Sequence, residues 1–121
     1  MDVDLVRAFE RAVGAGDVAA AVASVTDDVE VGGPRGSARG LEVFRGWVAG
    51  SGIRLETVRF FARGDVAVAV QAARWRGDDA VHEVATEFAE RDGRICRVVR
   101  HDDGVERALA AAGLSVADEV R

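Results

Sequence analysis

The sequence has no lysine and no tyrosine, and it contains a single proline and a single cysteine. All 16 basic residues are arginine, whereas aspartate and glutamate number 21, so the formal net charge is −5. The arginines are interleaved with acidic residues and form no basic stripe of the kind that nucleic-acid-binding proteins carry. A lone cysteine, Cys96, excludes an internal disulfide. The composition therefore argues against nucleic-acid binding and against a disulfide-stapled fold.

Long apolar runs are also missing, and none approaches the ~20 residues that a membrane helix needs. The segment Met1–Asp4 is acidic, whereas a secretory signal begins with positive charge and an apolar stretch. We therefore expect a cytoplasmic protein without a membrane partner, and its richness in Ala, Val, Gly and Arg is typical of a GC-rich bacterial genome. Hydrophobic residues make up 49% and charged residues 31% of 121 residues, which fits one globular domain.

The first part of the chain has the apolar periodicity of helices. Three stripes carry it: Leu5, Phe9, Ala12 and Val13; Val18, Ala21, Val22 and Val25; and Leu41, Phe44, Trp47 and Val48. Gly14–Gly16 ends the first helix, and Asp17 fits the N-cap of the second. Residues 29–31 could form a short strand. Residues 32–37 hold three glycines and the only proline, which predicts a loop.

From Ile53 the pattern becomes that of strands, rich in Val, Ile, Phe and Trp. Four strands are predicted, over residues 53–62, 66–75, 80–90 and 94–100. The turns between them are short, and this requires antiparallel neighbours, because a parallel connection needs a dozen or more residues. Asp103 fits the N-cap of a last helix, with Glu106 completing a capping box, and Gly113 ends it. We expect one domain over residues 1–114 and a loose tail over residues 115–121.

The strand over residues 66–75 is apolar on both faces, with only Gln71 and Arg74 breaking the run. A strand of this kind is covered on both sides. The helices of the chain can cover one face of the sheet. We therefore predict a homodimer in which the outer sheet face meets a second copy.

Several segments resemble the nuclear transport factor 2-like superfamily, and in particular its SnoaL-like (polyketide-cyclase-like and ketosteroid-isomerase-like) proteins. The segments are Gly14-Ala15-Gly16-Asp17, the stretch from Val25 to Val31, Phe88 with the hairpin over residues 90–95, His101-Asp102-Asp103, and the stretch from Ala108 to Leu114. The resemblance implies an α+β cone, in which a curved antiparallel sheet wraps around N-terminal helices. It also implies that ligands enter the open end of the cone, and that the ligand is a small, largely hydrophobic molecule.

Ketosteroid isomerases in this superfamily use a carboxylate base and two acidic hydrogen-bond donors. The resemblance places the base at Gly33 and the two donors at Phe9 and Val84. None of these side chains can move a proton or donate a hydrogen bond. Steroid isomerase chemistry by that mechanism is therefore excluded.

Acid–base chemistry of the polyketide-cyclase type would need other groups, and His82 and His101 are the candidates because imidazole titrates near neutral pH. By alternation His82 shares a face with Val84, Thr86 and Phe88, which should point into the cone. His101 ends the next strand, and the register leaves open whether the imidazoles meet. In the alternative interpretation, His82 lies at the rim in water and His101 bonds the backbone.

Glu83 and Glu87 should lie on the outer face, where Arg74 or Arg97 could pair with them. No metal or cofactor is expected, because the histidines and neighbouring acids lack the spacing of a metal site. Phe9, Trp47, Trp75, Val84, Thr86 and Phe88 are the candidate ligand-binding residues. Three functions remain open: a ligand-binding protein, an enzyme using His82 and His101, and a dimeric scaffold whose cone is filled by side chains.

Overall fold

The computed structural model describes all residues from 1 to 121. Its first three helices are α1 (Val3–Gly14), α2 (Val18–Ala23) and α3 (Leu41–Ser51). The predicted cap of α2 is confirmed, because the Asp17 carboxylate accepts a hydrogen bond from the Ala20 N–H at 3.1 Å. Gly52 is the C-cap of α3, and its φ of 61° is a left-handed conformation that favours glycine.

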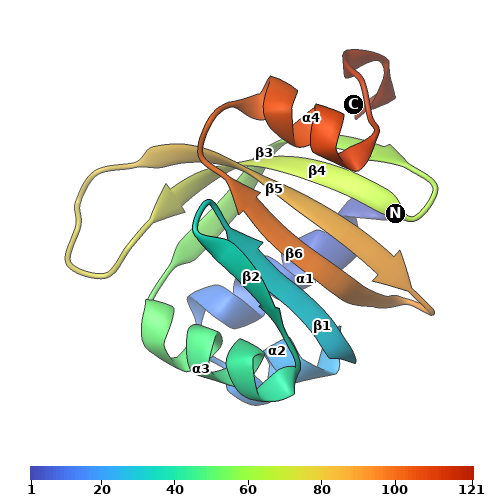
Figure 1. Ribbon diagram of the computed structural model, residues 1–121. Coiled ribbons are helices and arrows are strands. Elements are labelled where there is room, and N and C mark those ends of the chain that lie inside the picture. The colour runs from blue at the N-terminus through green and yellow to red at the C-terminus, as the bar shows by residue number, and fades with distance from the viewer.

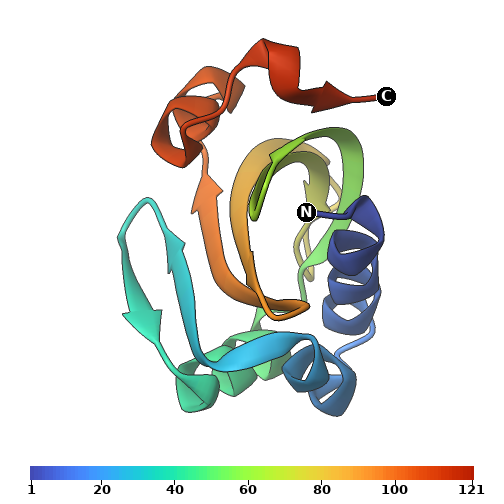
Figure 2. The same cartoon turned by 90° about the vertical axis from the view of Figure 1, so that its right-hand side faces the viewer.

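Seven strands form one sheet in the order β2-β1-β6-β5-β4-β3-β7. They are β1 (Val25–Gly33), β2 (Gly36–Arg39), β3 (Arg54–Arg63), β4 (Val66–Arg74), β5 (His82–Arg91), β6 (Arg94–His101) and β7 (Glu119–Val120). The predicted antiparallel meander is confirmed in β3 to β6, and β1 joins its edge parallel to β6. Figure 2 shows how strongly the sheet curls.

The curled sheet has helices on both of its faces (Figures 1 and 2). Its concave face packs with α1, α2 and α3 around a core of buried apolar side chains. Its convex face carries α4 (Val105–Ala112), whose Ala108 and Leu109 pack on Phe61, Val68 and Val70. The predicted cone is therefore present, and the expected order of helices, meander and closing helix is confirmed.

The region predicted as a loop over residues 32–37 is instead a hairpin. Strand β1 runs to Gly33 and β2 starts at Gly36, so that only Pro34 and Arg35 form the turn. The glycine at position 32 allows this pairing, since a Cβ there would lie 2.8 Å from the Ser37 Cβ. Glycine therefore serves strand pairing here, where composition indicated irregular structure.

Two predictions at the C-terminal end are wrong in detail. Gly104, with a φ of 110°, is the N-cap of α4 and no side chain caps this helix, so the expected capping box of Asp103 and Glu106 does not form. The segment after Gly113 is ordered where a loose tail was expected. A capping box joins Ser115 and Asp118, and β7 then pairs with β3.

The outer face of β4 is covered within the chain, because α4 packs on Val68 and Val70 and leaves them 0% and 2% exposed. These residues therefore need no partner subunit to keep them from water, and the homodimer remains a prediction. None of the helices combines the length and apolar character needed to cross a membrane.

Candidate functional site

An aromatic cluster fills the interior of the cone. Phe9 stacks on Trp47 with ring centroids 6.2 Å apart, and it meets the edge of Phe88 at 5.6 Å. Phe44 lies 6.1 Å from Trp47. The three phenylalanines have no exposed surface, whereas Trp47 is only partly buried. The structure therefore brings together three predicted ligand-binding residues, Phe9, Trp47 and Phe88, as one packed layer.

A chain of hydrogen bonds runs beside these rings, and Glu10 on α1 is its centre. The Glu10 carboxylate accepts from the Gln71 amide at 2.7 Å, from the Thr57 hydroxyl at 2.8 Å and from the Thr57 N–H at 3.3 Å. Gln71 in turn accepts from the Thr86 hydroxyl at 2.6 Å. All four residues are buried. Each bond thus points toward one carboxylate, which has no cationic partner in ion-pair contact.

Burial raises the pKa of the Glu10 carboxyl above its ordinary value, because a charged carboxylate loses hydration inside the cone. Hydrogen bonds donated by Thr57 and Gln71, together with the nearby charge of Arg7, act in the opposite direction. Because its pKa is raised, the Glu10 carboxyl keeps its proton to a higher pH than an exposed glutamate does. It is therefore the group in the interior best suited to bind or exchange a proton.

Sequence reasoning missed Glu10 and Thr57, although it noted that Gln71 interrupts an apolar strand. Thr86 and Val84 were predicted to face inward, and this is confirmed because they are buried opposite Ala69 and Gln71 on the concave face. The one residue in the sequence that could have indicated this chain of hydrogen bonds was Gln71. A fully buried amide requires a polar partner, and the strand itself offered none.

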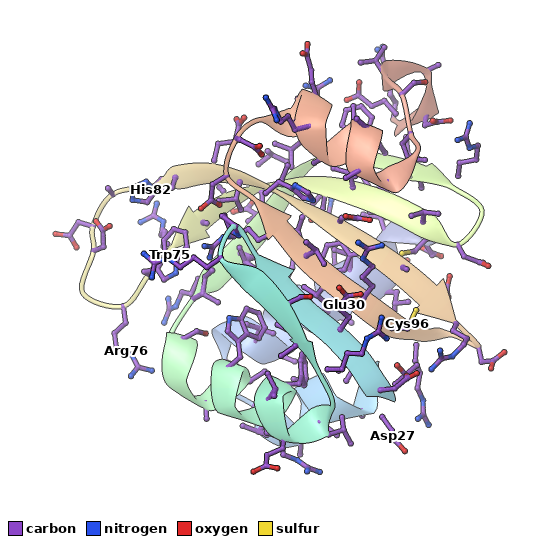
Figure 3. All side chains as sticks on the ribbon, in the orientation of Figure 1. Asp27, Glu30, Trp75, Arg76, His82 and Cys96 are labelled. Atoms are coloured by element: carbon purple, nitrogen blue, oxygen red, sulfur yellow. The ribbon has the colours of Figure 1, made fainter.

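Trp75 and His82 lie together at the end of the sheet, beside the connection between β4 and β5 (Figure 3). The indole and imidazole meet at 5.5 Å, and the Arg100 guanidinium lies 5.4 Å from the centre of the Trp75 ring. The His82 Nε2 is 3.1 Å from an Asp78 carboxylate oxygen, and both side chains are about half exposed. His82 therefore lies at the rim in water, as one of the two interpretations expected.

His101 lies on the other face of the sheet. Its register partner is Ala85, which packs beneath α4, whereas His82 pairs with Ala73 on the concave face. The His101 Nε2 is 3.2 Å from Glu87, whose other oxygen is 3.2 Å from Arg97. The predicted pairing of Glu87 with Arg97 is confirmed. The two histidines are thus separated by the sheet and share no pocket.

The positions at which the ketosteroid isomerase resemblance placed functional groups carry no such chemistry. Phe9 and Val84 are buried apolar side chains, and Gly33 ends β1. No three His, Cys, Asp or Glu side chains gather as a metal-binding cluster. The acidic group in the cone is instead Glu10, one position after Phe9 on the same helix.

Five hollows of the molecule lie at its surface. None of the five is lined by Phe9, Trp47, Val84, Thr86 or Phe88. One hollow of about 420 Å³ lies between α1 and the bulged part of β3. It reaches the buried chain of hydrogen bonds around Glu10, because Thr57 lies in its wall. A second, of about 300 Å³, includes Trp75. The aromatic cluster therefore borders none of these five hollows.

Comparison with solved structures places this architecture among known folds. An NTF2-like protein of unknown function from Cytophaga hutchinsonii is 18% identical, with a TM-score of 0.75 over 83% of this chain and 88% of that chain. A proposed polyketide cyclase from Sinorhizobium meliloti is 23% identical, with a TM-score of 0.70 over 80% and 93%. TerC, co-crystallised with polyporic acid, is 20% identical, with a TM-score of 0.73 over 91% and 95%.

These identities establish the fold and leave the activity open. Among curated proteins, none matches this chain. The family evidence comes from the sequence itself, because residues 6–98 match the model of the SnoaL-like domain. That stretch contains most of α1, all of α2 and α3, the strands from β1 to β5 and most of β6. The chain therefore belongs to the SnoaL-like domain family.

Proposed function

We propose that this protein binds a small, largely apolar molecule with one hydrogen-bonding group inside the cone. The observation that carries the proposal is the buried chain of Glu10, Thr57, Gln71 and Thr86 beside an aromatic cluster. Ligand sites typically combine an apolar lining with a few convergent polar groups. TerC, which has the same fold, was co-crystallised with a small molecule, polyporic acid.

Binding requires space, and Trp47 is the side chain best placed to provide it. It is the only member of the aromatic cluster that is partly exposed, and it stacks on Phe9. Rotation of the indole would uncover Phe9, next to Glu10 on α1. A ligand hydroxyl or carbonyl could then bond Glu10 or Thr86, while its rings replace the contacts of the indole.

The charge of the interior points to the kind of ligand. Glu10 has neutral donors as its hydrogen-bonding partners, and burial favours its protonated form. An anionic group beside it would add a second desolvated negative charge, which is unfavourable. We therefore expect a neutral ligand.

The experiment is a thermal-shift titration of the full chain with 2-naphthol, a flat and neutral phenol. A ligand selective for the folded state raises the melting temperature, by an amount that follows ligand concentration. We expect a saturable rise for the natural protein and a larger one for Trp47→Ala, which vacates the space that the ligand needs. Absence of a rise in both proteins at the solubility limit of the probe would contradict the proposal.

A second candidate is a non-catalytic scaffold whose cone is permanently filled. The observation that favours it is the complete burial of Phe9, Phe44 and Phe88, which line none of the five hollows. In that case Trp47→Ala would lower stability without creating affinity for 2-naphthol. Sedimentation of the same samples tests the proposed homodimer, which predicts twice the mass of the chain.

A further inference from the structure

A second candidate site lies outside the cone, in a hollow of about 300 Å³ at the end of the sheet. Arg54, Arg74 and Arg76 line it together with the indole of Trp75. Figure 3 shows Trp75 and Arg76 at the base of the connection that projects between β4 and β5. The hollow thus combines three cationic side chains with one flat aromatic surface.

The arginines are held close together by the sheet and by the helix ends below it. Arg54 and Arg74 are direct register partners in β3 and β4. The Arg76 side chain lies against Gly52, where a Cβ would come within 2.7 Å of its Nε. The glycine at position 52 therefore leaves the room that Arg76 occupies. The backbone positions of these residues therefore bring the three arginines together.

This arrangement is unfavourable without an anion. Like charges directly opposite in an antiparallel pair are destabilising. Arg59, Arg91 and Arg97 each have a carboxylate within ion-pair contact, but Arg54, Arg74 and Arg76 have none. The carboxylate-bearing neighbour in the hollow, Asp78, is bonded to the Ala80 N–H and to His82. The C-terminal ends of α1 and α3 border the hollow at Gly14 and Gly52, and their partial negative charge reduces this repulsion.

We propose that this hollow binds an oxyanion attached to a flat aromatic ring, with the arginines on the oxyanion and Trp75 against the ring. Guanidinium groups match the geometry of carboxylate and phosphate oxygens and bind them with two parallel hydrogen bonds. The site is independent of the proposed cone ligand, which is neutral and binds on the concave face. In a chain of net charge −5 it is also a local centre of positive potential.

The test is an NMR titration of the full chain with phenyl phosphate, followed at the two indole N–H signals. We expect a saturable shift of the Trp75 signal and little change at Trp47, with assignment by the loss of one signal in Trp75→Phe. Inorganic phosphate should bind several-fold more weakly, because it lacks the ring. A saturable shift at Trp47 instead would place phenyl phosphate in the cone and overturn this proposal.

The matched variants are two double substitutions with the same change in net charge. Arg54→Ser with Arg74→Ser should weaken phenyl phosphate binding about tenfold or more, since two charge-assisted contacts are lost. Arg45→Ser with Arg107→Ser removes two exposed arginines elsewhere and should leave the affinity within about twofold. Equal weakening by both pairs, or no saturable shift at Trp75 in the natural protein, would overturn the site. Neither outcome bears on 2-naphthol binding in the cone.

Discussion

The two faces of the sheet each bury a glutamate, and they do so in different ways. Glu10 lies against the concave face, 6% exposed, and its carboxylate accepts hydrogen bonds from the hydroxyl and the backbone N–H of Thr57 and from the Gln71 amide. Glu87 lies on the convex face, 1% exposed, between Arg97 and His101. One carboxylate is thus surrounded by neutral dipoles and the other by groups that carry or can carry positive charge.

The difference separates a structural ion pair from a candidate functional group. Glu87 and Arg97 continue into Glu30, which also contacts Arg39, so that a chain of opposite charges crosses the outer face from β5 to β2. The charged groups of this network are already paired with one another, so few of them are free to bind a ligand. Glu10 has no cation in ion-pair contact to hold it ionised, and a buried group of that kind remains responsive to what binds beside it.

The largest expected effect comes from removing one aromatic ring from each face. Phe88→Ala on the concave face and Phe61→Ala beneath α4 each delete a ring without exposed surface. Each should lower the free energy of unfolding by about 3–5 kcal/mol, measured by urea denaturation. Only the cavity left by Phe88→Ala adjoins the hydrogen-bond chain that includes Glu10 and Thr86. We therefore expect 2-naphthol to restore stability to that variant alone. Equal rescue of both variants would remove the distinction between the faces.

Breaking the outer ion pair should have an intermediate effect. Glu87→Gln keeps the size of the side chain but leaves Arg97 without its nearest carboxylate. We expect a loss of about 2 kcal/mol in unfolding free energy, below the range for a fully buried pair because Arg97 is 41% exposed. Glu83→Gln, on the same strand and face but exposed, is the control and should change stability by less than about 0.5 kcal/mol.

The smallest effect, about 1 kcal/mol at neutral pH, is expected for Glu10→Gln, and its size depends on pH. A raised folded-state pKa means that the folded protein keeps this proton over a range in which the unfolded chain loses it. The contribution of Glu10 is therefore complete below the ordinary pKa of 4.5 and is lost as the pH rises through the folded-state pKa. Urea denaturation of both proteins at a series of pH values measures it.

The difference in unfolding free energy, natural protein minus Glu10→Gln, should fall as the pH rises above 4.5. Subtracting the variant cancels the other titrating groups, which both proteins share. A difference that grows with pH would mean that the interior stabilises the ionised carboxylate, and the contrast between the two faces would be lost.

Much of the fold could be predicted because its signals are local. The strand predicted over residues 66–75 is observed as Val66–Arg74, and Asp17 caps α2 as expected. The errors arose where tertiary contacts overrule composition. Residues 32–37 contain three glycines, and yet they pair as the β1–β2 hairpin. The C-terminal segment is ordered because Glu119 in β7 bonds Arg59 in β3, 60 residues earlier.

The candidate site was less predictable, for a physical reason. Glu10 follows Phe9 on an amphipathic helix, and a charged residue beside an apolar stripe normally lies in solvent. Its partners Thr57 and Gln71 are 47 and 61 residues away, so no local pattern indicates the contact. The inward face of Val84, Thr86 and Phe88 followed from alternation alone. The positions of the two histidines depended on strand register, which alternation along one strand does not determine.

The central claim is that the concave interior, with its polar chain, is a site for a small neutral molecule. An NMR titration of the natural protein with 2-naphthol tests this most directly, because the Gln71 side-chain amide lies at the middle of the chain. We expect saturable shifts of that amide and of the Trp47 indole N–H, with the Trp75 indole unchanged. Shifts confined to Trp75 and the neighbouring arginines, with an unaltered Gln71 amide, would contradict it.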